Sequence, residues 1–256
     1  MKDISIVIPA YNASETIKAC IDSVVKNVKD ANLSYEIIVV DDGSKDNTLE
    51  LLQKMAKKNK NIIPVTQKNA GPSTARNNGM KKASGKYIAL NDSDDIWFEG
   101  KLKQQFDYLE KNPDVALICS NYGKLNITDT FEITYKQEMF HNYFSPQTSV
   151  FRREVIQDFI FNEKMKYSED MRFFLDVMSK YKCVFHSVLS TKNYFDKATF
   201  GSSGLSSHLW EMEKGELSNI KYVFKKGKIG LGIFISASIY SFIKFLRRCL
   251  ISATRK

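Results

Sequence analysis

Cysteine is scarce in this sequence, and the few cysteines are far apart. The 256 residues include only Cys20, Cys119, Cys183 and Cys249, and no two of these form a Cys-x-x-Cys pair. Small secreted domains stapled by disulfides and structural zinc sites both depend on closely patterned cysteines. Neither class is indicated, and we expect a reduced, cytoplasmic environment.

Long apolar runs are also lacking. The first residues, "MKDISIVIPAYN", contain a short apolar run interrupted by Pro9, which is unlike the longer apolar centre of a secretory signal. Near the other end, residues 229–243 carry no charge for 15 residues. As a helix they would measure roughly 22 Å, against about 30 Å for a hydrocarbon core. We expect this stretch to be too short to span a membrane alone.

Acidic residues are absent from the last forty positions. Residues 217–256 hold nine Lys or Arg and no Asp or Glu, so the net charge of +9 lies entirely there and the first 216 residues are balanced. An apolar stretch followed by Lys244, Arg247 and Arg248 is typical of a helix in the interface of an anionic bilayer, where each basic residue contributes about 1 kcal/mol. The alternatives are a helix packed on the domain, a true span, or the contact of a possible homodimer.

Repeats and low-complexity linkers are missing as well, whereas apolar residues make up 43% of the chain and aromatic residues 12%. Such a composition is sufficient for a packed core. We expect one compact domain over residues 1–215, followed by a basic, apolar helical tail over residues 216–256.

Continuous apolar strands alternate with helical patterns in the first hundred residues. Strands without polar alternation, separated by helices, indicate a mostly parallel sheet covered on both faces, and therefore an α/β, Rossmann-like fold. Asn12 and Glu15 have capping-box spacing before the first helix. The expected strands are "ISIVIPA", "YEIIVV", "NIIPVTQ", "KYIAL", "VALICS", "FEITY" and "CVFHSV"; the expected helices cover residues 17–28, 44–58, 73–83, 100–111 and 168–181.

Polar turns follow the first four of these strands. In open parallel sheets, ligands bind beyond the carboxyl ends of the strands, so these turns would line one crevice. They are residues 11–12, 41–44, 69–73 and 91–95.

The acidic turn after the fourth strand reads Asp92, Ser93, Asp94, Asp95. Carboxylates this close repel one another unless a cation, water or a basic partner offsets the repulsion. Hard oxygen ligands at a strand end suit Mg²⁺ or Mn²⁺, which would also bridge phosphates. A solvated turn or an acidic helix cap is the simpler alternative for an isolated Asp-Ser-Asp-Asp.

Three further charged groups belong to other turns and helix starts. Asp41 and Asp42 follow the second strand, where a carboxylate can accept hydrogen bonds from a base or a ribose. Arg76 lies in the first turns of the helix after "NAGPS", a reasonable anion site, although it could instead brace Asp42 or Asp94.

Glu169 and Asp170 begin an amphipathic helix. Carboxylates in a first turn commonly complement the helix dipole. The functional interpretation makes Asp170 a general base for a hydroxyl held within hydrogen-bond reach.

Together these stretches resemble a family 2 glycosyltransferase with the GT-A fold. The resemblance rests on "SIVIPAYNASETIKACIDSV", "YEIIVVDDGSKDNT", "NAGPSTARNNGMKKASGKYIALNDSDDIW" and "SEDMRFFLDV", which cover roughly residues 3–180 in the family's order. Asn91 departs from the family's more common apolar residue. Beyond residue 180 no motif can be matched; Ser202, Ser203, Ser206 and His208 are either a plain surface loop or a loop closing over a diphosphate.

The resemblance implies an inverting transfer of a sugar from a nucleotide-diphosphate donor, usually a UDP-sugar. Residues 1–98 would form the nucleotide-binding half and residues 99–215 the acceptor half. Asp94, with Asp92 and Asp95, would hold Mn²⁺ or Mg²⁺, and Asp170 would deprotonate the acceptor. The donor would lie against Pro9, Ala10, Tyr11, Glu15, Asp41, Asp42, Arg76, Asp92 and Ser93, with Asp42 near the uracil and Asp92 near the ribose or the metal.

The resemblance also suggests an acceptor and a location. The acceptor would be a saccharide or an undecaprenyl-diphosphate-linked saccharide in cell-surface polysaccharide synthesis. The enzyme would then lie on the cytoplasmic face of the inner membrane, attached peripherally through residues 217–256.

Three other functions compete with this interpretation. A nucleotidyltransferase would carry a Gly-rich loop with Lys or Arg after the first strand, where this chain has "PAYNASE". A nucleic-acid-binding protein is disfavoured by the acidic crevice and the apolar tail, so no nucleic-acid partner is expected. A non-catalytic sugar-nucleotide-binding protein remains open.

Overall fold

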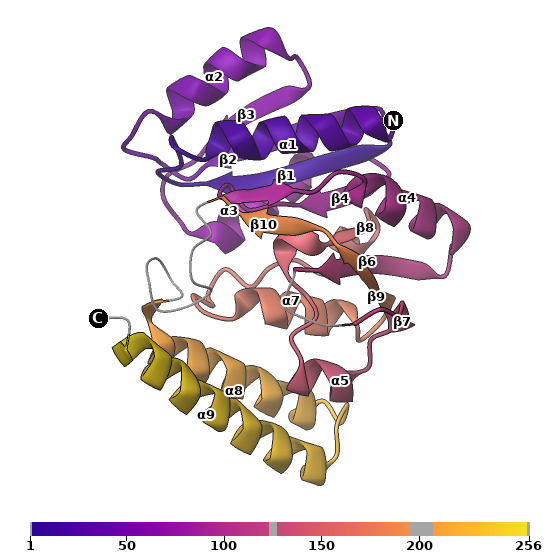
Figure 1. The fold of residues 1–256 in the computed structure, drawn as a ribbon, viewed down its shortest axis with the longest axis vertical. Coiled ribbons are helices and arrows are strands. Elements are labelled where there is room, and N and C mark those ends of the chain that lie inside the picture. The colour runs from indigo at the N-terminus through magenta and orange to yellow at the C-terminus, as the bar shows by residue number, and fades with distance from the viewer. Residues whose placement is uncertain (1, 123–126, 195–206, 255–256) are drawn as a thin grey trace.

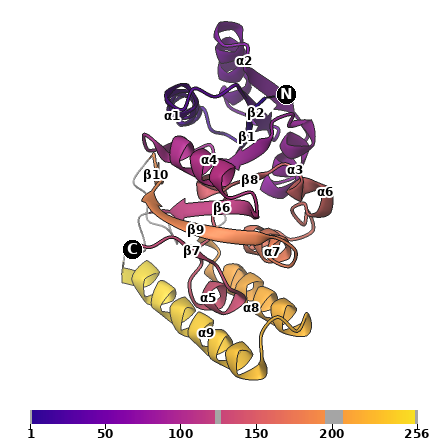
Figure 2. The ribbon, with the colours of Figure 1, turned by 90° about the vertical axis from the view of Figure 1, so that its right-hand side faces the viewer.

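The computed structural model describes residues 2–122, 127–194 and 207–254. An eight-stranded mixed sheet runs through the molecule in the order β3-β2-β1-β4-β8-β6-β9-β7, with helices on both faces, and a small second sheet pairs β10 with β5 (Figures 1 and 2). The strands are β1 (Ile4–Ala10), β2 (Tyr35–Asp41), β3 (Ile62–Thr66), β4 (Tyr87–Leu90), β5 (Asp95–Trp97), β6 (Val115–Asn121), β7 (Phe131–Glu132), β8 (Val150–Arg152), β9 (Lys182–Leu189) and β10 (Thr191–Asn193). The helices are α1 (Ile17–Asp30), α2 (Thr48–Lys58), α3 (Pro72–Lys82), α4 (Lys101–Lys111), α5 (Tyr135–Phe140), α6 (Val155–Asp158), α7 (Glu169–Val177), α8 (Leu209–Lys225) and α9 (Leu231–Thr254).

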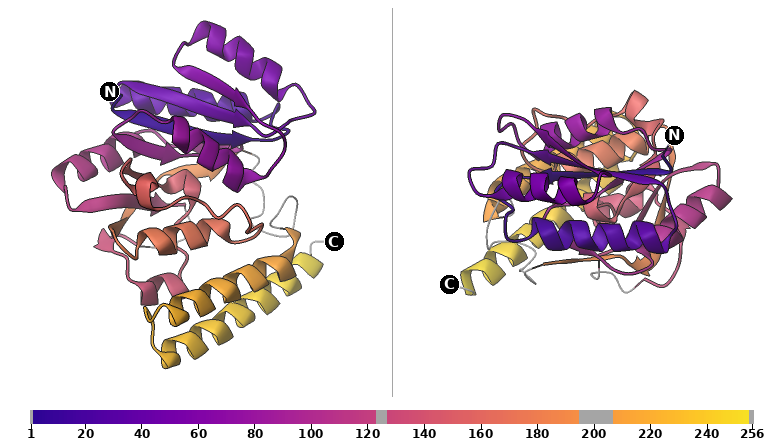
Figure 3. Two further views of the ribbon diagram at one scale, coloured as in Figure 1. Left: turned by 180° about the vertical axis from the view of Figure 1, so that it is seen from behind. Right: turned by 90° about the horizontal axis from the view of Figure 1, so that it is seen from above.

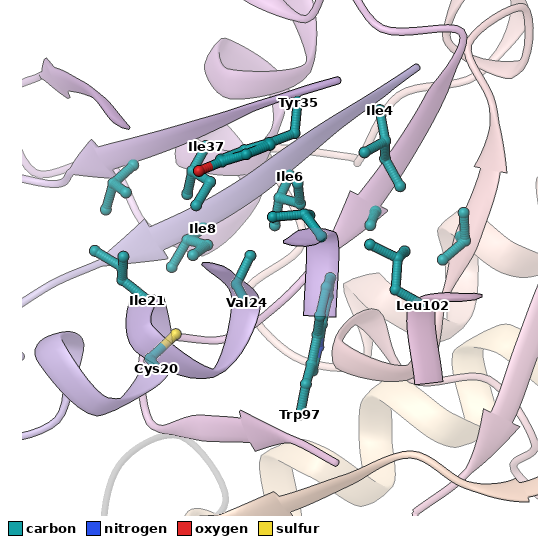
Figure 4. Packing of buried hydrophobic residues seen from close by; sticks show 14 of the residues in the cluster. Ile4, Ile6, Ile8, Cys20, Ile21, Val24, Tyr35, Ile37, Trp97 and Leu102 are labelled. Carbon is teal, nitrogen blue, oxygen red and sulfur yellow. The ribbon is translucent and has the colours of Figure 1, made fainter. Parts of the chain in front are cut away.

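The first four strands of the sheet are parallel, as the sequence pattern predicts. β1 pairs with β2 and with β4, and β2 pairs with β3, all in parallel register. Side chains alternate between two hydrophobic clusters, one under α1, α2 and α4 and the other under α3, α6 and α7. Figure 4 shows the first cluster, in which Ile6 and Ile8 of β1 face Val24 and Ile21 of α1. Burial on both faces explains why these strands are apolar without alternation.

Beyond β4 the sheet becomes mixed. The short strand β8, which the sequence analysis did not predict, lies between β4 and β6 and is antiparallel to both. β6 therefore runs in the same direction as β4, and their carboxyl ends reach the same edge of the sheet.

Three local predictions were wrong. Asn12 does not cap α1, because it has φ +49° and its Oδ1 accepts from the backbone N of Lys45 at 2.8 Å; α1 starts later, after Thr16. The second helix begins at Thr48 instead of Ser44, since Asp46 and its neighbours form the turn before it. The strand expected for "FEITY" covers only Phe131–Glu132.

The C-terminal helices form a hairpin that packs on the rest of the protein. α8 and α9 lie side by side below α5 and α7 (Figures 1 and 3), and all four helices share one apolar cluster. The division expected at residues 215/216 falls within α8, so the domain and its tail have a helix in common. Within the described ranges, no helix has the length and apolarity that crossing a membrane requires.

Partly buried ion pairs join the two helices of the hairpin. Glu213, whose side chain is fully buried, accepts from Ser241 Oγ at 2.9 Å and from Arg248 at 3.0 Å. Glu216 pairs with Lys244 at 2.5 Å. Two of the three basic residues after the apolar stretch therefore face α8.

Candidate active site

The turn after β4 is held in place by its own backbone and by Asn91. The Asn91 side chain is fully buried, and its Nδ2 donates to the carbonyl of Asp95 and to Cys20 Sγ, both at 3.2 Å. β5 then pairs with β10, and Trp97 fixes the pair by donating from Nε1 to the carbonyl of Gln147 at 3.2 Å. The departure at Asn91 thus has a structural reason: its amide closes the acidic turn.

The carboxylates of this turn accumulate negative charge. Asp94 accepts from Asn193 Nδ2 at 3.1 Å, and Asp95 accepts from the Tyr122 hydroxyl at 2.9 Å. Burial, and then the neighbouring Asp92 and Asp94, raise the pKa of Asp95 to about 8. Such a shift is expected where a carboxylate is buried beside other carboxylates.

A divalent cation fits the chemistry of this turn, because its donors are hard carboxylate oxygens. In the ranges that the structure describes, however, no three His, Cys, Asp or Glu side chains converge to form a metal site by themselves. Asp94, Asp95 and Asp92 would supply part of a coordination sphere, and phosphate oxygens and water would complete it. Mg²⁺ in particular is usually bound through one or two carboxylates together with substrate phosphates.

Arg76 joins the acidic turn to the start of α7. Its Nη2 is 2.7 Å from Asp92 Oδ1, and its Nη1 is 3.5 Å from Glu169 Oε1. Burial disfavours the guanidinium charge, but Asp92 and Glu169 outweigh burial and raise the pKa of Arg76. The residue therefore braces Asp92 and Glu169, and not Asp42 or Asp94 as considered from the sequence. It brings two acidic motifs that are 77 residues apart into one cluster.

The acidic pair at the start of α7 is tuned toward proton uptake. Burial, followed by the charge of Asp170, raises the pKa of Glu169 to about 7 despite the opposing effect of Arg76. Burial also raises the pKa of Asp170, although the hydrogen bond from the backbone N of Met171 at 2.7 Å opposes this. A carboxylate with a raised pKa is a better base than an exposed one, which suits acceptance of a proton from a hydroxyl.

The two acidic residues after β2 have different environments. Asp42 accepts from the backbone N of Ala70 through Oδ1 and of Gly71 through Oδ2, both at 2.8 Å, so its carboxylate shapes the loop that leads into α3. Asp41 is equally buried, and its Oδ1 has no hydrogen-bond partner within the described protein. A buried acceptor without a partner is costly unless a ligand donates to it. Asp41 is thus better placed than Asp42 to accept from a nucleotide base.

The remaining predicted residues lie at the same edge of the sheet. Pro9 and Ala10 are the last residues of β1, and Tyr11 follows them with 47% of its surface exposed. Glu15 is exposed in the turn before α1, and Ser93 is half-buried in the acidic turn. Ser202, Ser203 and Ser206 lie outside the described residues.

Sequence reasoning missed the hydrogen-bond partners of two metal-binding candidates, namely Asn193 for Asp94 and Tyr122 for Asp95. Tyr122 directly follows β6, so the rule of strand ends that located the four turns would have found it too. Asn193 had no local signal, because it approaches the acidic turn only through the pairing of β10 with β5.

Comparisons with known proteins agree with this geometry. Residues 5–174 match the model of the glycosyl transferase family 2. A glycosyltransferase of Haemophilus influenzae is 30% identical over 255 residues, which cover 94% of each chain. The UDP-Glc:alpha-D-GlcNAc-diphosphoundecaprenol beta-1,3-glucosyltransferase WfgD of Escherichia coli is 33% identical over 183 residues, covering 68% of this chain and 69% of that protein. By contrast, the chain spans only 30% of a Rickettsia conorii glycosyltransferase to which it is 32% identical.

Solved structures share the fold. TarS 1-349 of S. aureus superimposes with a TM-score of 0.68 at 19% identity, over 94% of this chain and 70% of that one. The mannosyltransferase PcManGT of Pyrobaculum calidifontis, solved with GDP-Man and Mn²⁺, gives a TM-score of 0.71 at 13% identity, over 100% of this chain and 76% of that one. The strand-end acids, the arginine between them and the family match lead to one conclusion: this chain belongs to the glycosyl transferase family 2 and has the GT-A fold.

Proposed function

We propose that this protein is an inverting glycosyltransferase that moves a sugar from a UDP-sugar to a hydroxyl of a saccharide acceptor, with Mn²⁺ or Mg²⁺ as cofactor. The observation that carries the proposal is the position of Arg76 between Asp92 and Glu169. Asp170 follows Glu169 directly, and its carboxyl is influenced by the charges of Arg76 and Asp92. This proximity supports a mechanism in which Asp170 and the acidic turn act on the same substrate.

The roles follow from the environments of the residues. Asp170 accepts the proton of the attacking hydroxyl, and its buried position keeps its basicity high. Asp41 accepts from the base of the donor, while Pro9, Ala10 and Tyr11 line the nucleotide. Asp94 and Asp95 hold the cation, which, when bound, offsets the charge that develops on the departing diphosphate.

The relatives support a UDP-sugar donor and a lipid-linked acceptor. The name of WfgD specifies UDP-Glc and a diphosphoundecaprenol acceptor, and TarS 1-349 was solved in complex with UDP-GlcNAc. UDP-glucose and UDP-N-acetylglucosamine are therefore the first donors to test.

The test is a screen of sugar nucleotides for UDP release, with and without a GlcNAc-diphosphate lipid and with Mn²⁺, Mg²⁺ or EDTA. We expect UDP release that needs both the metal and the acceptor. Pyrophosphate exchange in place of UDP release would identify a nucleotidyltransferase. UDP binding without turnover of any donor would leave only a sugar-nucleotide-binding function.

A lipid-linked acceptor requires access to a membrane, and the outer face of α9 suits that role. Among the described residues, thirteen large apolar side chains are exposed, and eight of them lie on α9. These eight are Leu231, Ile235, Ile239, Tyr240, Phe242, Ile243, Leu246 and Leu250. A continuous exposed apolar face of this kind is typical of an interaction surface.

An anionic bilayer is the partner that fits this face best. α9 contains no acidic residue, and Arg247 and the lysines at the hairpin turn, Lys225, Lys226 and Lys228, are exposed. We propose that α9 lies in the interface on the cytoplasmic side of the inner membrane while α8 holds it to the domain.

Vesicle flotation tests this attachment. Ile239→Glu/Ile243→Glu should lose binding to phosphatidylglycerol vesicles, whereas Ile160→Glu, an equally exposed isoleucine outside the hairpin, should keep it. Unchanged flotation of the double variant would refute the attachment. A wild-type dimer that the double variant converts to a monomer would assign the face to a second copy of the chain.

A further inference from the structure

We infer that α8 positions the acidic pair of α7, and that Gly215 and Asn219 are positioning residues for the transfer reaction. This inference rests on the proposed function, because it assigns α8 a part in the chemistry that Asp170 performs. The C-terminal hairpin would then have two roles: α9 binds the membrane, and α8 positions the acidic pair of the active site.

The residue just before the acidic pair has an unusual backbone. Ser168 has φ +54° and ψ +29°, the left-handed region that favours glycine and is unfavourable for other residues. Such a conformation persists only where the surroundings hold it. Here the surroundings are α8: Ser168 Oγ donates to the carbonyl of Met212 at 3.3 Å, and the carbonyl of Ser168 accepts from Asn219 Nδ2 at 2.9 Å.

Gly215 allows α8 to approach this residue. A Cβ atom at Gly215 would lie 2.8 Å from Ser168 Oγ and 2.8 Å from the carbonyl oxygen of Tyr167, which is closer than real Cβ contacts. The carbonyl belongs to the backbone and cannot rotate away alone. Any side chain at position 215 would therefore push the segment that leads directly into Glu169 and Asp170.

Asn219 ties the same segment to the body of α7. Its side chain is fully buried, and its Oδ1 accepts from Arg172 Nε at 2.9 Å while its Nδ2 holds Ser168. The Arg172 guanidinium stacks over the ring of Tyr222, 3.8 Å from the ring centroid. One face of α8 thus fixes both the entry to α7 and its first turn.

The position of Asp170 is sensitive to this support. The contact between Arg76 and Glu169 is 3.5 Å long, at the outer limit of a hydrogen bond, so Arg76 offsets the charge of Glu169 while α8 fixes the backbone that leads into it. A displacement of about 1 Å at a reacting group can lower the rate about 100-fold. The proposed donor site, in contrast, is built mainly on the ends of β1 and β2 and the start of α3.

The test compares two glycine-to-alanine variants of the hairpin. Gly215→Ala should lower kcat for UDP release with the GlcNAc-diphosphate lipid by about 10- to 100-fold while the Kd for UDP stays unchanged. Gly232→Ala is the matched control, because a Cβ there meets no atom within 4 Å. Its kcat should equal that of the wild type.

Two further variants separate positioning from general destabilisation. Ser168→Gly removes the side chain that a new Cβ would strike and should restore part of the kcat of Gly215→Ala. Asn219→Asp keeps the acceptor for Arg172 but faces the Ser168 carbonyl with a carboxylate, so it too should lower kcat and not the affinity for UDP. If Gly215→Ala fails to fold, Asn219→Asp carries the test.

The inference is overturned if these variants leave kcat unchanged, or if Gly215→Ala lowers activity by the same factor in an Asp170→Asn background as in the wild type. If Gly215→Ala acts through Asp170, it should lower the activity of the Asp170→Asn variant only slightly. If the wild type turns over no donor, the proposed function fails, and amide exchange still tests α8. Gly215→Ala, but not Gly232→Ala, should then speed hydrogen exchange at residues 168–172.

Discussion

The nucleotide half of this protein and its C-terminal hairpin handle charge in opposite ways. In residues 2–98, Asp41, Asp92, Asp94 and Asp95 gather at the strand ends with Arg76 as the buried basic partner of the turn. In the hairpin, the buried carboxylate of Glu213 and the partly buried carboxylate of Glu216 are matched by Arg248 and Lys244. Where charges are matched within the protein, they fix one helix on another; where acids outnumber bases, a ligand has to complete the balance. The difference separates a binding edge from a structural joint.

Removing the base should produce the largest effect on activity. Asp170→Asn keeps the size of the side chain and removes its ability to take a proton, so we expect kcat to fall by about 100- to 10,000-fold. The Kd for UDP should change little, because Asp170 belongs to α7, whereas Asp41, the proposed partner of the base, belongs to β2. Isothermal titration with UDP, beside a UDP-release assay, measures both quantities. Full activity in this variant would remove Asp170 from the mechanism.

Breaking the arginine brace should cost both stability and activity. Arg76→Met leaves Asp92 and Glu169 without their buried cation, and loss of one partner of a buried pair typically costs about 3–5 kcal/mol. Urea denaturation gives the free energy of unfolding. Lys18→Met, at an exposed pair with Asp22, is the control and should leave the free energy of unfolding nearly unchanged. Equal effects of the two substitutions would contradict the brace.

The sequence predicted the nucleotide half well for a physical reason. Strands buried on both faces are apolar throughout, and glycine and proline mark the turns, so the fold and the four polar strand ends could be recognised locally. The resemblance implies Asp42 as the acid near the base. The sequence could not reveal that Asp42 accepts from the backbone of Ala70 and Gly71 while Asp41 keeps an oxygen without a partner among the described residues, because this depends on the folded loop.

The hairpin was harder to predict from sequence. The charge of residues 217–256 predicted that Lys244 and Arg248 face a lipid surface. Both instead pair with acidic residues that precede this segment, Glu216 and Glu213. The apolar stretch similarly serves two purposes: Ile233 and Phe234 pack toward α5 and α7, while Ile239 and Ile243 face outward. Periodicity alone does not tell which face a partner covers.

The pH dependence of stability should report on the acidic pair at the start of α7, which Arg76 joins to the nucleotide half. The pKa of Glu169 is about 7 in the folded protein, above its usual value of 4.5. The folded state therefore binds a proton more tightly than the unfolded state. This contribution to stability is present below about pH 4.5 and is lost as the pH rises through about 7.

Urea midpoints measured at pH 5 and pH 8 test this sign. Glu169→Gln should remove part of the decline between the two values, because glutamine does not titrate. Glu50→Gln, at an exposed pair with Lys54, should leave the decline unchanged. A decline that persists in full in Glu169→Gln would assign it to other groups.

The hairpin joint should give the smallest of these effects on activity and a moderate effect on stability. Glu213→Gln keeps an acceptor for Ser241 but removes the charge that Arg248 faces, and hydrogen bonds to charged groups contribute about 1.5–3 kcal/mol. We expect a loss of about that size in the free energy of unfolding, with kcat within about twofold of the wild type, because α8 remains bound to α7 through Asn219 and Gly215. Glu211→Gln, whose pair with Lys214 is exposed, provides the control on the same helix. A large loss of kcat in Glu213→Gln without a loss of stability would mean that the joint between α8 and α9 acts on the active site directly, and the separation between a structural joint and a binding edge would no longer hold.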